Sequence, residues 1–259
     1  MNSRLANRVW SREELMVAFN LYCQTPFSKI DRHLASIIEL AHILGRTPSS
    51  VALKLLNFAR LDPTLKERSI TGLSHGNKVE LDIWNEFNKN WDELAFKSEQ
   101  IIAQLQGKNI EEISAINTSD LPREGKERSA IVKTRVNQQF FRRMILASYN
   151  NTCCMSGMRV PELLVASHII PWFMDEKNRM NPHNGLCLNA LHDKAFDNGL
   201  ITVTPEYRIR ISEKLKNPRA FCQEHFLPLK GEKIRLPHRF PPARDLLEYH
   251  NRFVFIDQI

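Results

Sequence analysis

The sequence predicts an α+β protein in which a helical N-terminal domain precedes a domain that combines short strands with helices. Apolar residues recur at helical spacing through the first part of the chain, whereas short apolar runs broken by turns dominate the later part. A stretch of weak periodicity, containing Pro122 and Gly125, lies between them. For a chain of 259 residues, two domains are the better expectation. We therefore predict a helical domain over residues 1–106, a linker over 107–127 and a second domain over 128–259.

The N-terminal domain is expected to open with three helices. Ser11, with Glu14 three residues later, gives a capping-box pattern that starts the first helix. A second helix is predicted from about residue 34 to 44, and Gly45 is a natural stop. Thr47 then offers a cap and Pro48 a first helical position for the third helix.

This order of helix, short glycine turn and helix resembles helix-turn-helix and Myb-like DNA-binding domains. The resemblance implies that side chains at the start of the third helix reach a DNA groove. The candidates are Arg46, Ser49, Ser50 and Lys54. The possibility that the helix pair is only a scaffold stays open, because residues 1–119 hold 14 basic and 14 acidic residues.

Two longer helices are predicted further along the chain. Val79, Ile83 and Phe87 mark the apolar stripe of a helix from about residue 78 to 99. Another helix, from roughly residue 132 to 149, opens the second domain. Its polar face carries Arg142 and Arg143, which we interpret as candidate DNA contacts.

Charge and composition narrow the class of protein. The net charge is +7, and residues 120–259 hold 22 basic and 15 acidic residues, so the excess lies there. A basic half beside a neutral half suggests a polyanionic partner, although solubility alone would also explain it. The five cysteines are odd in number and fit no disulfide framework. No apolar run is long enough to span a bilayer, and we expect a cytoplasmic protein without a membrane partner.

A cluster of polar residues between Ser167 and Asp197 carries the chemistry. A buried strand is expected over residues 163–169, and it contains His168 near its end. A loop leads to a second short strand, residues 184–188, and Asn189 then begins a helix. Asp193 and Asp197 are four residues apart, so their carboxylates share one helix face.

These residue types suit metal-assisted hydrolysis of a phosphodiester. Paired carboxylates with open positions suit Mg²⁺ or Mn²⁺, which can also bind phosphate oxygens. A histidine with a pKa near neutrality can deprotonate water. Taken singly, a Ser-His-Ile strand is usually core and an Asp pair is usually a solvated helix face. Their occurrence together, in this order, favours a catalytic site.

The segment resembles the HNH (ββα-metal) endonuclease superfamily, in particular its restriction-type members. The matching phrases are Ser167 to Ile169, Asn184 to Asn189 and His192 to Ile201. The resemblance implies that His168 is the general base and that Asn184 orders the loop and holds that base. The last motif position, a metal-binding His in many relatives, falls on Asp193, with His192 one residue earlier, so either could bind the metal.

Two departures from the family pattern affect the expected ligands. Many relatives carry an acidic residue or a His directly before the base, where this chain has Ser167, which makes Asp197 more important. Many also carry two Cys-x-x-Cys pairs for structural zinc; this chain has none, and we expect no zinc knuckle.

The favoured function is metal-dependent cleavage of double-stranded DNA in a bacterial restriction or defence role. Target choice, including choice by base modification, would belong to the N-terminal domain. A second hypothesis is a DNA-binding regulator with a degenerate nuclease fold. A third is an effector that senses a small molecule, and a fourth is a cysteine nucleophile acting with His168. Whether the protein forms a homodimer is left open.

Overall fold

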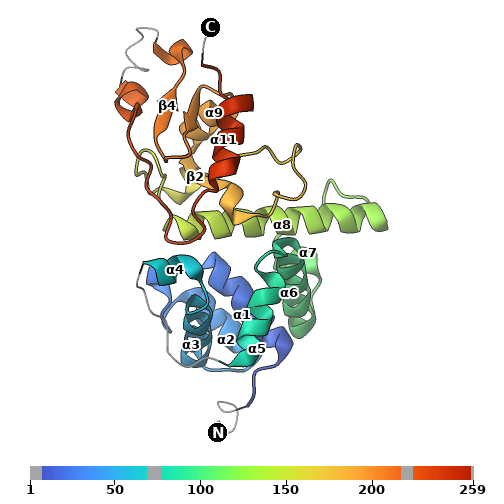
Figure 1. Ribbon diagram of the computed structural model, residues 1–259. Coiled ribbons are helices and arrows are strands. Elements are labelled where there is room, and N and C mark those ends of the chain that lie inside the picture. The colour runs from blue at the N-terminus through green and yellow to red at the C-terminus, as the bar shows by residue number, and fades with distance from the viewer. Residues whose placement is uncertain (1–7, 69–76, 217–223, 258–259) are drawn as a thin grey trace. The chain divides into compact units, whose positions relative to one another are not determined.

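The computed structural model describes residues 8–68, 77–216 and 224–257 (Figure 1). The chain forms two compact units, Met1–Ala147 and Ser148–Ile259. We call them the helical unit and, after the resemblance that its sequence carries, the nuclease unit. The division lies at the end of the long basic helix and not in the predicted linker. The predicted linker itself contains a short helix.

The helical unit consists of helices of different lengths. They are α1 (Arg12–Gln24), α2 (Ala35–Leu44), α3 (Pro48–Ala59), α4 (Pro63–Glu67), α5 (Lys78–Phe87), α6 (Trp91–Gln106), α7 (Ile110–Ile113) and α8 (Lys126–Ser148), with a 3-10 turn at Phe27–Lys29. The capping box of Ser11 and Glu14 starts α1, and Gly45 ends α2 in the left-handed conformation, as predicted. The helix predicted over residues 78–99 is two helices, because Asn88 and Asn90 interrupt it.

An aromatic cluster forms the centre of the helical unit. The ring of Phe19, which is fully buried, lies 4.9 Å from that of Phe58 and 5.3 Å from that of Trp84, measured between centroids. Trp91 lies 6.1 Å away on another helix. These rings join α1, α3, α5 and α6, so the apolar stripes that predicted the helices meet in one core.

Within the described residues, the nuclease unit contains two two-stranded sheets together with the helices α9 (Ala190–Asp197) and α11 (Arg244–Phe253). The strands are β1 (Leu164–His168), β2 (Gly185–Asn189), β3 (Ile201–Val203) and β4 (Ile209–Ile211). Short 3-10 turns lie at Pro161–Leu163, Pro182–Asn184, Glu213–Lys216 and Leu227–Leu229. β1 pairs antiparallel with β2, and β3 pairs antiparallel with β4.

Helix α9 packs against β1, β2 and β3, which gives the predicted ββα arrangement. Asn189 caps the helix by accepting a hydrogen bond from the backbone N–H of His192. Gly199 ends it at φ +66°, and a Cβ there would lie 2.1 Å from the backbone oxygen of Val254. Only glycine fits that position, so the end of α9 and the segment after α11 are fixed together.

The observed division changes how the charge is distributed. Residues 1–147 hold 21 basic and 17 acidic side chains, and residues 148–259 hold 15 and 12. The excess is therefore +4 in the helical unit and +3 in the nuclease unit, because α8 and its flanks belong to the former. The expectation that the whole excess lies in the nuclease domain does not hold for the units as they fold.

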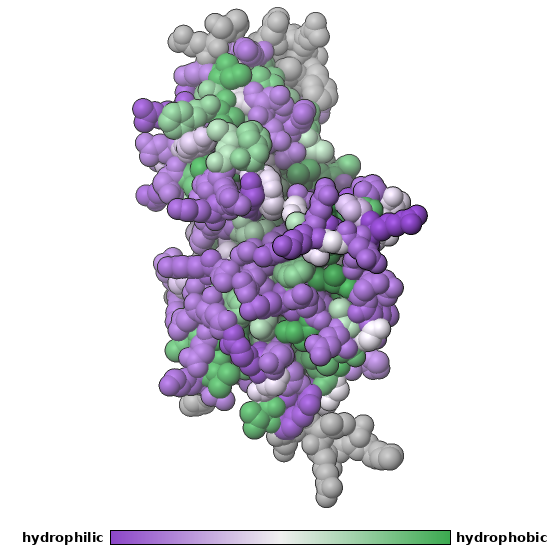
Figure 2. All heavy atoms as spheres, turned by 90° about the vertical axis from the view of Figure 1, so that its right-hand side faces the viewer, coloured by the Kyte–Doolittle hydropathy of each residue, from purple (hydrophilic) through white to green (hydrophobic). Residues whose placement is uncertain are grey.

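Most of the face shown in Figure 2 is hydrophilic, with separate hydrophobic patches. Within the described residues, none of the helices has the length and apolar character needed to cross a bilayer. The four described cysteines, Cys23, Cys153, Cys154 and Cys187, are buried and unpaired, and Cys222 lies outside the described residues.

Candidate active site

His168 ends strand β1 and is held in place by the loop that follows it. Its Nε2 lies 2.9 Å from the backbone oxygen of Arg179. A carbonyl oxygen can only accept a hydrogen bond, so Nε2 carries the proton and Nδ1 is the unprotonated nitrogen of the neutral ring. The ring of Trp172 meets the imidazole edge-on, with 5.5 Å between the centroids. The structure thus fixes both the orientation and the tautomer of His168.

Burial shifts the ionisation of His168 towards the neutral form. Desolvation lowers its pKa below the ordinary value of 6.5, and the hydrogen bond with Arg179 opposes this only in part. A neutral imidazole at neutral pH can accept a proton. The surroundings of His168 therefore suit a general base.

Asn184 ties both ends of this loop together. Its side-chain oxygen accepts from the backbone N–H of Ile170 at 2.8 Å. Its Nδ2 donates to the backbone oxygens of Ile170 at 3.1 Å and Asn178 at 3.2 Å, and the side chain is fully buried. The backbone oxygen of Asn184 also accepts from the N–H of Ile169. Asn184 therefore orders the loop directly after His168.

Asp193 and Asp197 lie on helix α9 and share an environment that disfavours two negative charges. Partial burial raises the pKa of each carboxyl above the usual value of 3.8. The charge of Asp193 raises the pKa of Asp197 further, and Lys194 acts in the opposite direction on both. A bound cation would relieve this repulsion.

Ser167 brings strand β1 next to helix α9. Its side chain is buried, and its hydroxyl lowers the pKa of Asp193, which places the two side chains next to each other. A buried hydroxyl next to a partly buried carboxylate is an oxygen donor that a cation held by Asp193 could also contact. Ser167 stands at the position where many relatives carry a metal ligand.

His192 points into the interior of the nuclease unit. It is 3% exposed, and its Nδ1 lies 3.7 Å from Cys153 Sγ and 3.4 Å from Asn189 Nδ2. The contact with His192 helps to lower the pKa of the Cys153 thiol to about 6, against the effect of burial. Because His192 is occupied in this way, its placement favours Asp193 as the metal ligand at this motif position. The described contacts of Cys153 join it to His192 and not to His168.

The donor set fits Mg²⁺ or Mn²⁺ better than a metal enclosed by protein ligands. Among the described residues, no three His, Cys, Asp or Glu side chains gather to hold a metal ion. Mg²⁺ is commonly bound by one or two carboxylates, with water and substrate phosphate completing its shell. Among the described residues of this segment, Asp193, Asp197 and the hydroxyl of Ser167 offer oxygen donors that could contribute.

The residues of the helical unit that were expected to contact DNA differ in how far they are buried and bonded. Arg46 is a correction to the expectation, because its side chain is 1% exposed and bonded to Glu14 at 2.7 and 3.0 Å. Its guanidinium also lies 4.1 Å from the centre of the Trp10 ring. Lys54 is bonded to the buried Glu80. These two cations stabilise the helical unit and are not presented to a groove.

The remaining candidate DNA contacts are less constrained. Ser49 is exposed and Ser50 is half-buried at the start of α3. On α8, Arg143 is exposed and lies 3.4 Å from Gln24, while Arg142 is half-buried. Of the predicted set, Ser49 and Arg143 are thus the most exposed.

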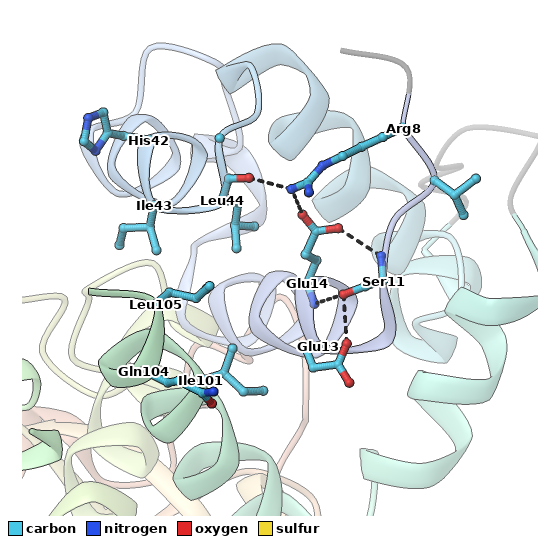
Figure 3. A pocket seen from close by; sticks show the side chains of 12 residues that line it. Arg8, Ser11, Glu13, Glu14, His42, Ile43, Leu44, Ile101, Gln104 and Leu105 are labelled. Carbon is cyan, nitrogen blue, oxygen red and sulfur yellow. Dashed lines mark hydrogen bonds and ion pairs between the residues drawn. The ribbon is translucent and has the colours of Figure 1, made fainter. Parts of the chain in front are cut away.

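A pocket of about 830 Å³ in the helical unit lies beside the ion pair of Arg46 and Glu14, and Glu14 is one of its lining residues (Figure 3). The end of α2, the last turns of α6 and the start of α1 line it. Arg8 bonds to Glu14 and to the backbone oxygen of Leu44, and Glu14 accepts from the N–H of Ser11. The polar wall of the pocket is therefore already bonded to itself.

A histidine on one strand, an antiparallel partner strand and a helix with paired carboxylates together form a ββα arrangement around the candidate site. Comparison with known families gives its class. Residues 153–204 match the family model described as HNH endonuclease. The chain therefore contains an HNH endonuclease domain, and such a domain indicates nuclease activity on a nucleic acid. No curated protein was found to match the chain.

Two features of the site escaped sequence reasoning. The carbonyl of Arg179, which fixes the tautomer of His168, is a backbone group and leaves no mark in the residue types. The bond between Cys153 and His192 joins residues 39 positions apart. The only signal for it was that both belong to the segment rich in Cys and His.

Proposed function

We propose that the protein is a divalent-metal-dependent endonuclease that hydrolyses phosphodiester bonds of double-stranded DNA. The observation that carries the proposal is the position of His168. Its neutral ring is locked on a strand whose preceding residue, Ser167, lies against the carboxylate of Asp193. The candidate base and the two candidate metal-binding carboxylates thus all lie within the segment that the HNH family model matches.

In the proposed reaction His168 accepts the proton of the attacking water on Nδ1. The hydrogen bond from Nε2–H to Arg179 stabilises the imidazolium that forms. Asp193 and Asp197 would hold the divalent ion. When bound, that ion supplies positive charge against the phosphate oxygens and the leaving 3′-oxygen. Without a cation the two carboxylates would repel the substrate, so the proposal requires metal dependence.

For the biological role we propose bacterial restriction or defence, with target choice in the helical unit. The support is the modular build, in which a separate helical unit accompanies the nuclease unit. Since Arg46 and Lys54 are occupied within the unit, contacts with DNA would involve Ser49, Ser50 and Arg143. A preference for modified bases belongs to this part of the proposal.

A DNA-binding regulator with a degenerate site is the second candidate. The observation that favours it is Ser167, which replaces an acidic residue or a His at the position before the base. The two candidates can be distinguished by DNA cleavage, because only the proposed enzyme hydrolyses DNA, whereas the regulator only binds it.

Supercoiled plasmid DNA, incubated with the purified full chain and Mg²⁺ or Mn²⁺, distinguishes the two candidates. The enzyme gives nicked and linear products, and EDTA abolishes them. Asp193→Asn combined with Asp197→Asn serves as the matched control, because it removes charge at nearly constant size. DNA binding without any cleavage under either metal would support the regulator and refute the proposal.

A further inference from the structure

Next to the candidate active site, the nuclease unit exposes a contiguous set of apolar side chains. Phe173, at 79% exposure, is the most exposed large apolar residue described in this unit, and Met174 and Phe253 are exposed as well. The hydroxyl of Tyr249 lies 3.9 Å from Met174 Sδ, and its ring lies 4.8 Å from that of Phe253. We call Phe173, Met174, Tyr249 and Phe253 the apolar ridge. It joins the loop after β1 to helix α11.

The exposure of Phe173 occurs on a turn whose backbone is fixed. The N–H of Met174 donates to the backbone oxygen of Pro171 at 2.9 Å. Nε of Arg179 donates to the backbone oxygen of Trp172 at 2.7 Å. Both neighbours of Phe173 are thus bonded into the loop while its ring stays in water. Isolated exposed apolar residues are common, but packing within this unit gives no reason for a contiguous ridge.

The apolar ridge adjoins the proposed general base. The ring of Trp172 contacts His168, and Phe173 is the next residue in the chain. Because consecutive Cα atoms are about 3.8 Å apart, the Cα atom of Phe173 lies that far from the Cα atom of Trp172. The ring of Phe173 lies on the order of 10–15 Å from His168 by this reasoning. At roughly 3.4 Å for each base-pair step, this distance corresponds to three or four steps of duplex DNA.

The charges around Phe173 leave cations available for a polyanion. Asp175 is occupied within the loop, where it accepts from the backbone N–H groups of Lys177 and Asn178. Glu176 pairs with Arg179 at 3.4 Å. Lys177 forms no ion pair with a described residue, and the same holds for Arg252 next to Phe253. The two acidic side chains are bonded within the loop, whereas Lys177 and Arg252 can bind phosphates.

We propose that Phe173, supported by Met174, is a wedge that enters the stack of bases about three or four steps from the scissile phosphate. The inference rests on the proposed DNA endonuclease function. Proteins that insert into DNA from a groove use apolar side chains such as Phe and Met, and they partly unstack one base step. A single ring projecting from a tight turn fits such a gap, whereas a protein partner would require a broader apolar face.

The wedge gives the nuclease unit a sequence preference that needs no hydrogen bond to a base. Unstacking is easiest at pyrimidine–purine steps such as TA and CA/TG. Cleavage sites of the full chain should therefore be enriched in such steps at a fixed offset from the cut. This preference is separate from any target choice made by the helical unit.

The test compares Phe173→Ala with the wild-type full chain on two versions of one duplex. The first is intact, and the second carries an abasic site at the step where the wedge is expected to enter, about three or four steps from a cut made by the wild type, so that this step is already unstacked. Loss of one stacking contact predicts ~10-fold slower single-turnover cleavage of the intact duplex by Phe173→Ala. On the abasic duplex the two proteins should cleave at the same rate, which also shows that the variant is folded.

Two further variants sharpen the comparison. Phe173→Trp keeps a flat ring and should cleave the intact duplex at close to the wild-type rate. Leu163→Ala removes an exposed side chain in the turn Pro161–Leu163, directly before β1, and the cleavage rate of this variant should equal that of the wild type. A further measurement uses a duplex that carries 2-aminopurine at the predicted step. Binding of the His168→Ala protein should raise the fluorescence of the 2-aminopurine. Binding of the double variant, His168→Ala with Phe173→Ala, should leave that fluorescence unchanged.

Three results would overturn the wedge. Equal rates for wild type and Phe173→Ala on the intact duplex would refute it while leaving the nuclease function standing. Conversion of a dimer to a monomer by Phe173→Ala, measured by sedimentation, would assign the apolar ridge to a second copy of the chain instead. A wild-type protein that cleaves no DNA would refute the proposed function, and the wedge with it.

Discussion

The two units use their basic side chains differently. Of the eleven ion pairs found among the described residues, nine lie in the helical unit and two in the nuclease unit. In the helical unit cations such as Arg46 and Lys54 are bonded to buried carboxylates. In the nuclease unit cations such as Lys177 and Lys194 form no ion pair with a described residue. Net charge alone does not reveal this difference, because it is similar in the two units.

The comparison shows that a cation contributes to nucleic-acid binding only when its own fold leaves it available. A buried pair such as Arg46 with Glu14 is costly to break and cannot also bind phosphate. An exposed lysine adds little to stability but can displace counterions from DNA. We therefore expect changes in the helical unit to alter stability, and changes in the nuclease unit to alter binding and catalysis.

The largest effect is expected for the paired carboxylates of the nuclease unit. Asp193→Asn and Asp197→Asn should each weaken Mg²⁺ or Mn²⁺ activation by at least ~10-fold, the loss typical even of outer-shell partners of a metal. The double variant should be inactive. Cleavage rates measured against metal concentration give the half-saturation point for each protein. Unchanged metal dependence in both single variants would place the ion elsewhere.

Arg46→Ala tests the structural role of charge in the helical unit. Removal of one partner leaves the Glu14 carboxylate without its principal partner, and breaking such a buried pair costs about 3–5 kcal/mol. The free energy of unfolding, measured by chemical denaturation, should fall by this order. If Arg46→Ala instead left stability intact and weakened DNA binding, Arg46 would be a DNA contact after all.

Acid should destabilise the nuclease unit through His250. This side chain is buried between Thr202 and Phe196, and desolvation lowers its pKa from 6.5 to about 4. As the pH falls below 6.5 the unfolded chain binds a proton that the folded unit does not, so the stabilisation present above pH 6.5 is lost towards pH 4. At pH 5 this loss is about 2 kcal/mol.

The His250→Gln variant lacks this titrating imidazole. Its free energy of unfolding should therefore fall less than that of the wild type between pH 7.5 and pH 5. Denaturation curves at both pH values give the difference. The helical unit offers a contrast, because the pKa of Glu14 is lowered from 4.5, so its stabilisation is lost only below that pH. Equal pH dependence for wild type and His250→Gln would contradict this assignment.

The smallest effect is expected for single exposed lysines of the nuclease unit. Lys177→Ala and Lys194→Ala should each reduce the slope of log affinity against log salt by about one. Their unfolding temperatures should stay at the wild-type value. A lysine variant with an unchanged salt slope would show that this cation does not contact phosphate.

The sequence predicted the site segment better than the division of the chain. β1, β2 and α9 lie within a residue or two of their expected limits, because Asn189 and Gly199 are local signals for the start and end of a helix. The division at residue 147 depends on long-range bonds. Arg128 pairs with Glu111, and Arg135 with Asp120, which ties α8 to the preceding segment. Residue types cannot show that an Arg faces inward, and this also applies to Arg46.

The sequence also could not show which way the side chain of His192 points, for a similar reason. Helical spacing shows which residues share a face, but neither Asn189 nor the motif shows that Cys153 lies behind that face. Similarly, His168 was found from its place on a strand, whereas its tautomer depends on a carbonyl from a loop. The side chains that the proposed chemistry requires could be predicted from the sequence, whereas the groups that position them could not.

We expect His168, with Nε2 protonated and Nδ1 as the nitrogen that accepts the proton of water, to be the general base. The most direct test is the single-turnover rate of duplex cleavage from pH 5 to 8 at saturating Mg²⁺, for wild type and His168→Ala. The wild-type rate should rise with pH and level off, with a midpoint below 6.5, because burial keeps the imidazole neutral. His168→Ala should be ~10²–10⁴-fold slower and lack that midpoint while still binding DNA. A His168→Ala rate within a factor of about two of wild type, or the same midpoint in both proteins, would contradict the claim.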